Sequence, residues 1–223
     1  MFGYGTRSAE EVFAILFSFI IATTIHEFMH AWSAWKLGDD TAAKLGRVSL
    51  NPAVHFEPFG LFGMALIAFG FPAIGWGKPV PVNPNRLSGS IARRKVSMGL
   101  IAFAGPLSNV VQAAVVAIPL RFGDGSLRSI SMPGTAEFYM AWFVWVNILL
   151  ASFNLIPIPP LDGHKILVAI LPNFWYPVLA PLERYGFIIL LALLFVGGSL
   201  GASIIGGITG PVRNLLLDAF LPF

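Results

Sequence analysis

The sequence has no cysteine and few charged residues. Without cysteine the chain can form no disulfide bond and offer no thiolate ligand, so a metal site would need histidine, aspartate or glutamate. Charged residues make up 11% of the chain, whereas about 25% is usual for a soluble domain. Hydrophobic residues make up 56%. This balance excludes an ordinary soluble domain and is typical of a membrane protein.

The formal net charge of the chain is also small, at +3. Most lysines and arginines lie in loops beside apolar stretches, above all between residues 38 and 95, which is the distribution expected of cytoplasmic loops. The pattern gives no support to nucleic-acid binding. Residues 1–11 precede an apolar run with ionisable groups that a cleavable signal would lack, so we expect them in the mature protein.

Four apolar stretches are long enough to cross a bilayer, for which a helix needs about 20 residues. They cover residues 12–37, 96–120, 136–156 and 187–210. Stretches 59–76 and 161–182 are interrupted by glycine or proline and are uncertain as spans. Basic residues flank the first of these two, which favours a re-entrant or interfacial hairpin over a short full span.

Short strands or hairpin edges are expected at residues 44–50 and 80–82, within the segment 38–95 that is rich in glycine, proline and positive charge. The predicted fold is an all-α polytopic membrane protein with four to six transmembrane helices. It includes a small membrane-associated β-hairpin or sheet, and it can include a re-entrant segment. We expect residues 1–223 to form one membrane-embedded domain.

Placing the basic segment 38–95 in the cytoplasm gives a consistent topology. The first span then runs inward and carries His26 and His30 in its inner half. The span 136–156 also runs inward and delivers Asp162 near the same leaflet. We therefore expect a multi-pass protein of the cell membrane whose site lies toward the cytoplasmic side.

Residues 26–30 read His-Glu-Phe-Met-His, the pattern H-E-x-x-H. Residues four apart on a helix share one face, about 5 to 6 Å apart, so His26 and His30 can hold one zinc ion. Glu27 can then take a proton from water bound to zinc. The alternative is a chance pattern, or polar side chains that bond between helices, but such groups are costly in an apolar span.

A catalytic zinc site needs a third protein ligand and an open position. Asp162 is the leading candidate, because it follows a proline-rich stretch that cannot continue a helix and precedes a glycine that allows a turn. The alternative is that Asp162 only caps the helix that follows, since aspartate is a favoured N-cap residue.

Together these residues resemble the site-2 protease family of intramembrane metalloproteases, in its compact form without PDZ or CBS domains. The resemblance covers residues 15–170. The family pattern N-x-x-P-x-x-x-L-D-G is matched by Asn154, Pro157, Leu161, Asp162 and Gly163. The family pattern G-P-x-x-N is matched by Gly105, Pro106 and Asn109. Segments 46–52 and 77–84 also look like the bacterial and archaeal branch.

The resemblance implies roles for six residues. His26, His30 and Asp162 would bind zinc, Glu27 would be the general base, and Asn154 and Asn109 would support catalysis by donating to the oxyanion. For both asparagines the alternative is a hydrogen bond between helices. Neither His55 nor His164 is expected to bind the metal, and the residues that bind substrate are unknown from the sequence.

The implied activity is zinc-dependent hydrolysis of peptide bonds within or next to transmembrane segments of substrate proteins, in regulated intramembrane proteolysis. The partners would be those substrates and the lipid bilayer. Two alternatives are a transporter or metal channel, which needs a polar path through both leaflets, and a scaffold without activity, which has no need of Glu27. A similar ligand set can also hold iron.

Overall fold

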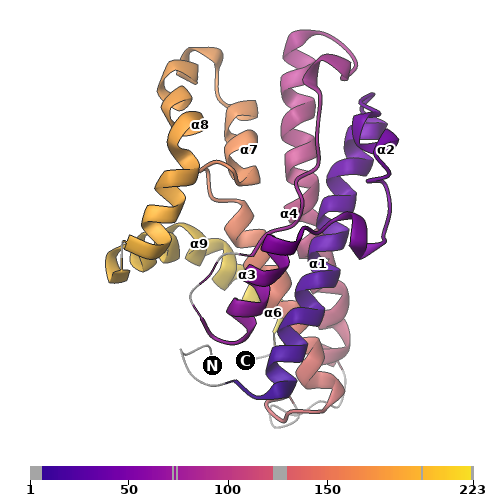
Figure 1. Cartoon of the computed structure of the whole chain (residues 1–223), viewed down its shortest axis with the longest axis vertical. Helices are drawn as coiled ribbons and strands as arrows, with labels where there is room; N and C mark the ends of the chain where they lie inside the picture. The colour runs from indigo at the N-terminus through magenta and orange to yellow at the C-terminus, as the bar shows by residue number, and fades with distance from the viewer. Residues whose placement is uncertain (1–6, 72, 74, 123–129, 197, 222–223) are drawn as a thin grey trace.

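Four helical stretches in the described part of the chain are long and apolar enough to cross a bilayer. The computed structural model describes residues 7–71, 73, 75–122, 130–196 and 198–221. The spans are α1 (Ala9–Lys36), α4 (Ile91–Phe122), α6 (Ala136–Asn154) and the stretch Asn173–Phe195 that contains α8 (Figure 1). The protein is therefore a multi-pass membrane protein with a helical fold.

Helix α1 has strong local signals at both ends. Ser8 accepts a hydrogen bond from the Glu11 backbone, and the Glu11 side chain accepts one from the Ser8 backbone, which is a capping box. Gly38 follows the helix with a φ of 107°, a conformation that favours glycine. Between these ends the helix is almost entirely apolar until His26.

Helix α4 lies at the centre of the bundle and packs against both α1 and α6. Its buried positions are mostly small residues, which let helix backbones approach closely within a membrane. These small buried residues are Ser97, Gly99, Ala102, Gly105, Ser108, Ala113 and Ala117. The close packing brings α4 and α6 against α1.

The segment between α1 and α4 contains α2 (Thr41–Lys44), η1 (Pro52–Val54), α3 (Pro58–Ala68) and η2 (Pro84–Arg86). Helix α3 packs on α1, and the Arg7 side chain donates to the carbonyl of Ile67 near its C-terminus at 2.7 Å. At 11 residues α3 is too short to span a bilayer. Helix α3 therefore does not form a full span, and the re-entrant segment stays a prediction.

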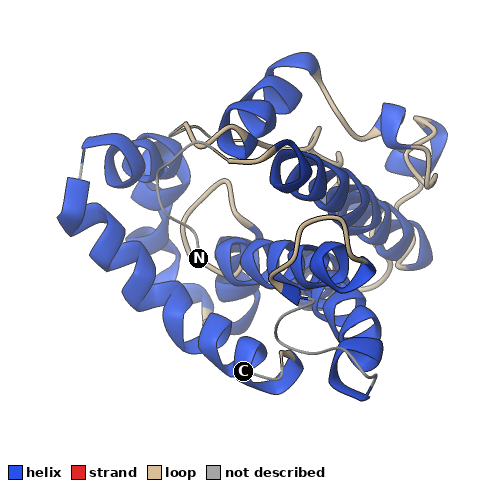
Figure 2. Ribbon diagram, turned by 90° about the horizontal axis from the view of Figure 1, so that it is seen from below, coloured by secondary structure: helices blue, strands red, loops and turns tan. Residues whose placement is uncertain are grey.

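The strands expected at 44–50 and 80–82 are absent from the described residues (Figure 2). Lys44 ends α2 instead, and Asn51 caps the next helical turn by accepting from the Ala53 backbone. Pro79 and Pro81 have no N–H group to give to a ladder, which explains why the second segment has no paired strand. A β-hairpin is therefore not part of the described structure.

The last span differs from the expected stretch 187–210. Helix α8 (Tyr176–Leu191) begins earlier, is followed by the π-helical turn η4 (Ala192–Val196), and gives way to α9 (Gly198–Phe220). A Cβ at Gly201 would lie 2.0 Å from the Leu193 carbonyl, so only glycine allows this close return. The prediction of one span over residues 187–210 is therefore wrong.

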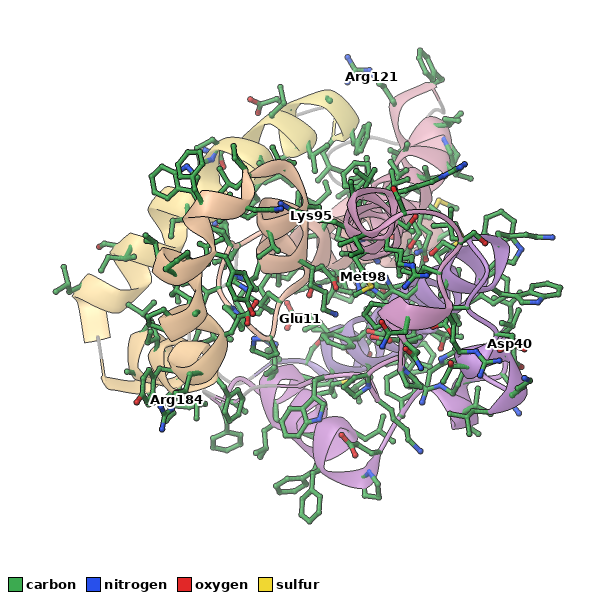
Figure 3. The ribbon with its side chains drawn as sticks, turned by 90° about the horizontal axis from the view of Figure 1, so that it is seen from above. Glu11, Asp40, Lys95, Met98, Arg121 and Arg184 are labelled. Carbon is green, nitrogen blue, oxygen red and sulfur yellow. The ribbon has the colours of Figure 1, made fainter. Side chains whose placement is uncertain are left out.

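Helix α7 (Asp162–Ile170) joins α6 to this last pair and packs on α4. The Lys95 ammonium at the start of α4 donates to the Leu171 carbonyl at 2.5 Å and to Asn173 Oδ1 at 2.7 Å. Figure 3 shows Lys95 pointing toward the α7 and α8 side of the molecule, away from Asp40. This contact holds the end of α7 against the core.

Asp39 joins the two ends of the segment between α1 and α4. Its buried carboxylate accepts from the Thr41 backbone at 3.0 Å and from the Asn83 backbone at 2.6 Å. Next to it, Asp40 forms ion pairs of 2.7 Å with Lys44 and Arg86. The hydrogen bond from Lys44 and the charge of Arg86 lower the pKa of Asp40. These contacts return the chain to the C-terminal end of α1 shortly before α4 begins.

We expect Asp39→Ala to lower the free energy of unfolding by about 2 to 3 kcal/mol, because two part-buried backbone N–H groups lose a buried, charged acceptor. The measurement is the thermal unfolding midpoint of the purified protein in detergent. Asp218→Ala, an exposed aspartate on α9, is the matched control and should leave the midpoint unchanged. Equal midpoints for the two variants would contradict this role of Asp39.

Candidate metal centre

His26 and His30 lie one turn apart on α1 and turn their rings toward the same point. Both are buried, with 5% and 7% of their surface exposed, and their Nε2 atoms are 3.0 Å apart. Asp162 reaches this point from the first turn of α7. Its Oδ2 atom lies 3.2 Å from Nε2 of His26 and 3.1 Å from Nε2 of His30.

The chain before Asp162 explains how the carboxylate gets there. Helix α6 ends at Asn154, and the next seven residues contain three prolines and form turns without a regular helix. Leu161, not Asp162, is the N-cap residue of α7, and no side-chain hydrogen bond caps this helix. A Cβ at Gly163 would lie 2.3 Å from the Leu155 carbonyl, so glycine is required beside Asp162.

The other ring nitrogens of both histidines have acceptor partners. Nδ1 of His26 donates to Asn109 Oδ1 at 2.6 Å, and Nδ1 of His30 donates to the Ile101 carbonyl at 2.7 Å. A neutral imidazole has one proton, so both Nε2 atoms then carry lone pairs. Such outer partners are usual for histidines that bind metals.

This arrangement suits a cation. Three acceptor atoms lie 3.0 to 3.2 Å from one another with no proton of their own to share when the rings are neutral. Tetrahedral ligands at bond lengths of about 2.0 to 2.1 Å are separated by about 3.3 Å, close to the observed spacing. In the described part of the chain, this is the one group of three such side chains that could hold a metal ion.

Gly105 of α4 closes the other side of the centre. A Cβ there would lie 2.4 Å from Nε2 of His30 and 2.6 Å from Nε2 of His26. The absence of a side chain therefore leaves the space that a metal ion would need. Sequence reasoning noted Gly105 only as part of a family pattern, because no local property of the sequence shows which helix faces the histidines.

A pocket of about 510 Å³ opens beside these three side chains. Glu27 and Asn154 both line it, so the structure brings the expected base and one expected oxyanion donor to the same space. The amide of Asn154 donates one hydrogen bond to the Leu150 carbonyl at 3.0 Å. In the described part of the chain, no hydrogen bond or ion pair engages the Glu27 carboxylate.

Asn109 lies elsewhere than its expected role requires. Its side chain is fully buried and does not line the pocket. Its Oδ1 accepts from His26, while its Nδ2 donates to Asn147 Oδ1 at 2.9 Å and to the Ala22 carbonyl at 3.3 Å. This geometry corresponds to orienting His26 and to the alternative of a bond between helices, in place of donation to an oxyanion.

The remaining histidines lie outside the metal group. The buried His55 donates from Nε2 to the Ser49 carbonyl at 2.6 Å, and burial lowers the pKa of this imidazole, which favours its neutral form. His164 points toward Glu183 of α8, with 3.6 Å between Nε2 and Oε1. Neither belongs to the three-residue group, as expected from the sequence.

The sequence did not identify the residues that border the pocket opposite α7. Residues 75–82, which we name the pocket wall, have no regular secondary structure and supply much of this side. Their lining members are Gly75, Trp76, Gly77, Pro79, Val80 and Val82. The alternation of glycine, proline and valine was a signal of irregular chain, but it did not show what the chain borders.

Comparison with known proteins gives a consistent family. The profile of Peptidase family M50 matches residues 128–197. The Bacillus subtilis protein with the provisional name zinc metalloprotease YwhC is 33% identical over 210 residues, which are 92% of this chain and 90% of that protein. No solved structure gives a significant match.

Two further relatives carry provisional zinc metalloprotease names. Rip2 of Mycolicibacterium smegmatis is 28% identical over 183 residues, which are 81% of this chain and 66% of that protein. MJ0611 of Methanocaldococcus jannaschii is 41% identical over 88 residues, 39% of this chain and 41% of that protein.

The fold and the three converging side chains define a multi-pass membrane protein with a buried metal-binding centre. The extent of the likeness to YwhC assigns it further: the chain belongs to peptidase family M50, the site-2 protease family. The resemblance seen in the sequence motifs is confirmed, and the protein is a metallopeptidase.

We expect Gly105→Ala to lower zinc affinity more than about tenfold, because the added methyl group fills the space between the two imidazoles. The measurement is zinc content after dialysis against a weak chelator. Gly206→Ala on α9, where an added Cβ meets no atom within 4 Å, is the matched control. Undiminished zinc in the Gly105 variant would show that the centre lies elsewhere.

Proposed function

We propose that this protein is an intramembrane zinc metalloprotease that hydrolyses peptide bonds within or next to transmembrane segments of substrate proteins, as in regulated intramembrane proteolysis. The observation that carries the proposal is the meeting of His26, His30 and Asp162 beside a pocket that Glu27 also lines. Family membership and the zinc metalloprotease names of the relatives support it.

His26, His30 and Asp162 would hold the zinc ion, with the pocket at its open side. When bound there, zinc supplies Lewis-acid chemistry: it polarises the scissile carbonyl and makes water nucleophilic near neutral pH. The ligand set can also hold iron, and the names of the relatives favour zinc. Asn109 would act by orienting His26.

Glu27 would be the general base and then the general acid. Its carboxylate takes the proton of the attacking water and returns it to the leaving amine. Asn154 would donate to the developing oxyanion, because an amide nitrogen carries a second hydrogen besides the one given to Leu150. Both side chains line the pocket, which allows them to act on one peptide bond.

The substrate would enter as an unwound stretch of a transmembrane helix, since helical hydrogen bonds shield a peptide bond from attack. The expected edge at residues 44–50 is not a strand, but the pocket wall lies along the pocket without regular structure. Pro79 and Pro81 offer no N–H group there, so an extended substrate would donate its own N–H groups to carbonyls of the pocket wall, as a partial form of β-augmentation. Irregular backbone at this depth is tolerated where it lines a cavity.

We place the protein in the cell membrane with the centre toward the cytoplasm. The histidines lie in the second half of α1, on the side where that helix ends. The same end carries most of the basic side chains between α1 and α4, and such side chains favour the cytoplasmic face. Transmembrane proteins and lipid would be the partners. The distribution of basic residues gives no support to nucleic-acid binding.

We expect Glu27→Gln to keep about one zinc per chain and to lose at least about 100-fold in the cleavage rate of a transmembrane substrate, because the glutamine cannot accept the proton. His26→Ala and Asp162→Ala should lose zinc as well as activity. The measurements are zinc content and cleavage by the protein in detergent.

The control is Glu10→Gln, the same change at an exposed position in the first turn of α1. It should match the unmodified protein in both measurements. Cleavage by the Glu27 variant at the rate of this control would overturn the assignment of the base. Full zinc in the His26 or Asp162 variant would overturn the ligand assignment.

A further inference from the structure

The pocket wall is held in place from the side that faces away from the pocket. Gly77 and Pro79 line the pocket, whereas Lys78 between them does not. The Lys78 backbone N–H donates to the His55 carbonyl at 2.7 Å, and the Lys78 carbonyl accepts from Nη2 of Arg47. Both backbone polar groups of Lys78 are therefore engaged, one by a residue before η1 and the other by the residue that follows it.

Arg47 is an unusual residue for such a contact because it is buried, with 4% of its surface exposed. In the described residues no carboxylate forms an ion pair with it, and its Nε atom has no hydrogen-bond partner. A buried charge without a carboxylate to neutralise it is costly. Burial of this guanidinium therefore costs stability, and the bond to the Lys78 carbonyl offsets part of that cost.

The acidic residue whose charge acts on Arg47 is Glu27 of α1. Burial lowers the pKa of the Arg47 guanidinium, and the negative charge of Glu27 acts in the opposite direction. His55 adds no competing charge, because its pKa is lowered by burial and its Nε2 proton is given to Ser49. Arg47 thus lies close enough to the centre for Glu27 to affect it.

The pocket wall also packs directly on α1. A Cβ at Gly77 would lie 2.7 Å from Cγ2 of Thr23 and 3.2 Å from Oε1 of Glu27. Gly77 is bonded to Lys78, so a displacement of the Lys78 backbone would move the wall relative to the Glu27 carboxylate. The contact from Arg47 to Lys78 therefore fixes the surface that faces the expected base.

We propose that Arg47 is a positioning residue for peptide hydrolysis, which holds the Lys78 carbonyl and thereby fixes the pocket wall against Glu27. The inference rests on the proposed function, because the wall matters for cleavage only if Glu27 is the base. It adds a residue that touches neither the metal ligands nor the pocket. Arg47 acts on the reaction through the backbone that it holds.

The test compares Arg47→Met, Arg47→Lys and Arg121→Met. Arg121 is the matched control, because its Nη1 also donates to a backbone carbonyl, that of Ala219, at 2.8 Å. It lies in the last turn of α4 and does not line the pocket. We expect Arg47→Met to keep its zinc and to lose about 10- to 100-fold in kcat/KM for a transmembrane substrate, as misplacement near a reacting group does. Arg47→Lys keeps a charged donor and should lose less.

A second measurement does not depend on activity. Hydrogen–deuterium exchange of peptides covering residues 75–82 should become faster in Arg47→Met and stay unchanged in Arg121→Met, because the Lys78 backbone is no longer held. Unchanged exchange, or cleavage equal to that of the Arg121 variant, would overturn the proposal. If the unmodified protein cleaves no transmembrane substrate, the proposed function fails instead, and exchange still tests whether Arg47 fixes the wall.

Discussion

The imidazole rings of His26 and His30 lie on an apolar helix, and their nitrogens need hydrogen-bond or metal partners from the rest of the bundle. Each buried polar nitrogen needs a partner, because an unpaired polar group inside a low-dielectric bundle is costly. Helix α4 supplies acceptors for both Nδ1 atoms, through the Asn109 side chain and the Ile101 carbonyl. The Nε2 atoms are left facing Asp162, and a metal ion is the group that satisfies all three.

Helix α4 lies at the centre of the bundle, where it can supply these partners. Gly105 provides the space beside the rings, and the neighbouring small residues let α1 approach closely enough for the hydrogen bonds to form. Asn109 is in turn held by Asn147 of α6. The orientation of His26 therefore depends on three helices, which gives the centre a rigid support before any substrate binds.

The centre itself could be predicted from the sequence because its chemistry is local. H-E-x-x-H places His26 and His30 on one face by helix geometry alone, and the proline-rich approach to Asp162 marks a non-helical stretch before a turn. The resemblance then paired two motifs far apart in sequence. The distances and outer partners now support the ligand assignment that we propose, while the three transmembrane helices around the centre had the expected bounds within a few residues.

The errors lie where long-range packing decides. Nothing local reveals that Gly201 packs closely on the Leu193 carbonyl, so the apolar run 187–210 predicts one helix where the structure has a break. Pro79 and Pro81 have extended character but no donors, so a strand was expected where only an unpaired segment exists. The link from Arg47 to Lys78 joins residues 31 positions apart, and no sequence pattern predicts it.

X-ray absorption at the zinc edge of the purified protein tests the central claim most directly. The account predicts about one zinc per chain with nitrogen and oxygen ligands at about 2.0 to 2.1 Å, and with outer scattering from two imidazole rings. Replacement of His30 by alanine should leave at most one ring in any zinc that remains. Zinc bound with no imidazole scattering, or no zinc in protein prepared without chelators, would contradict the account.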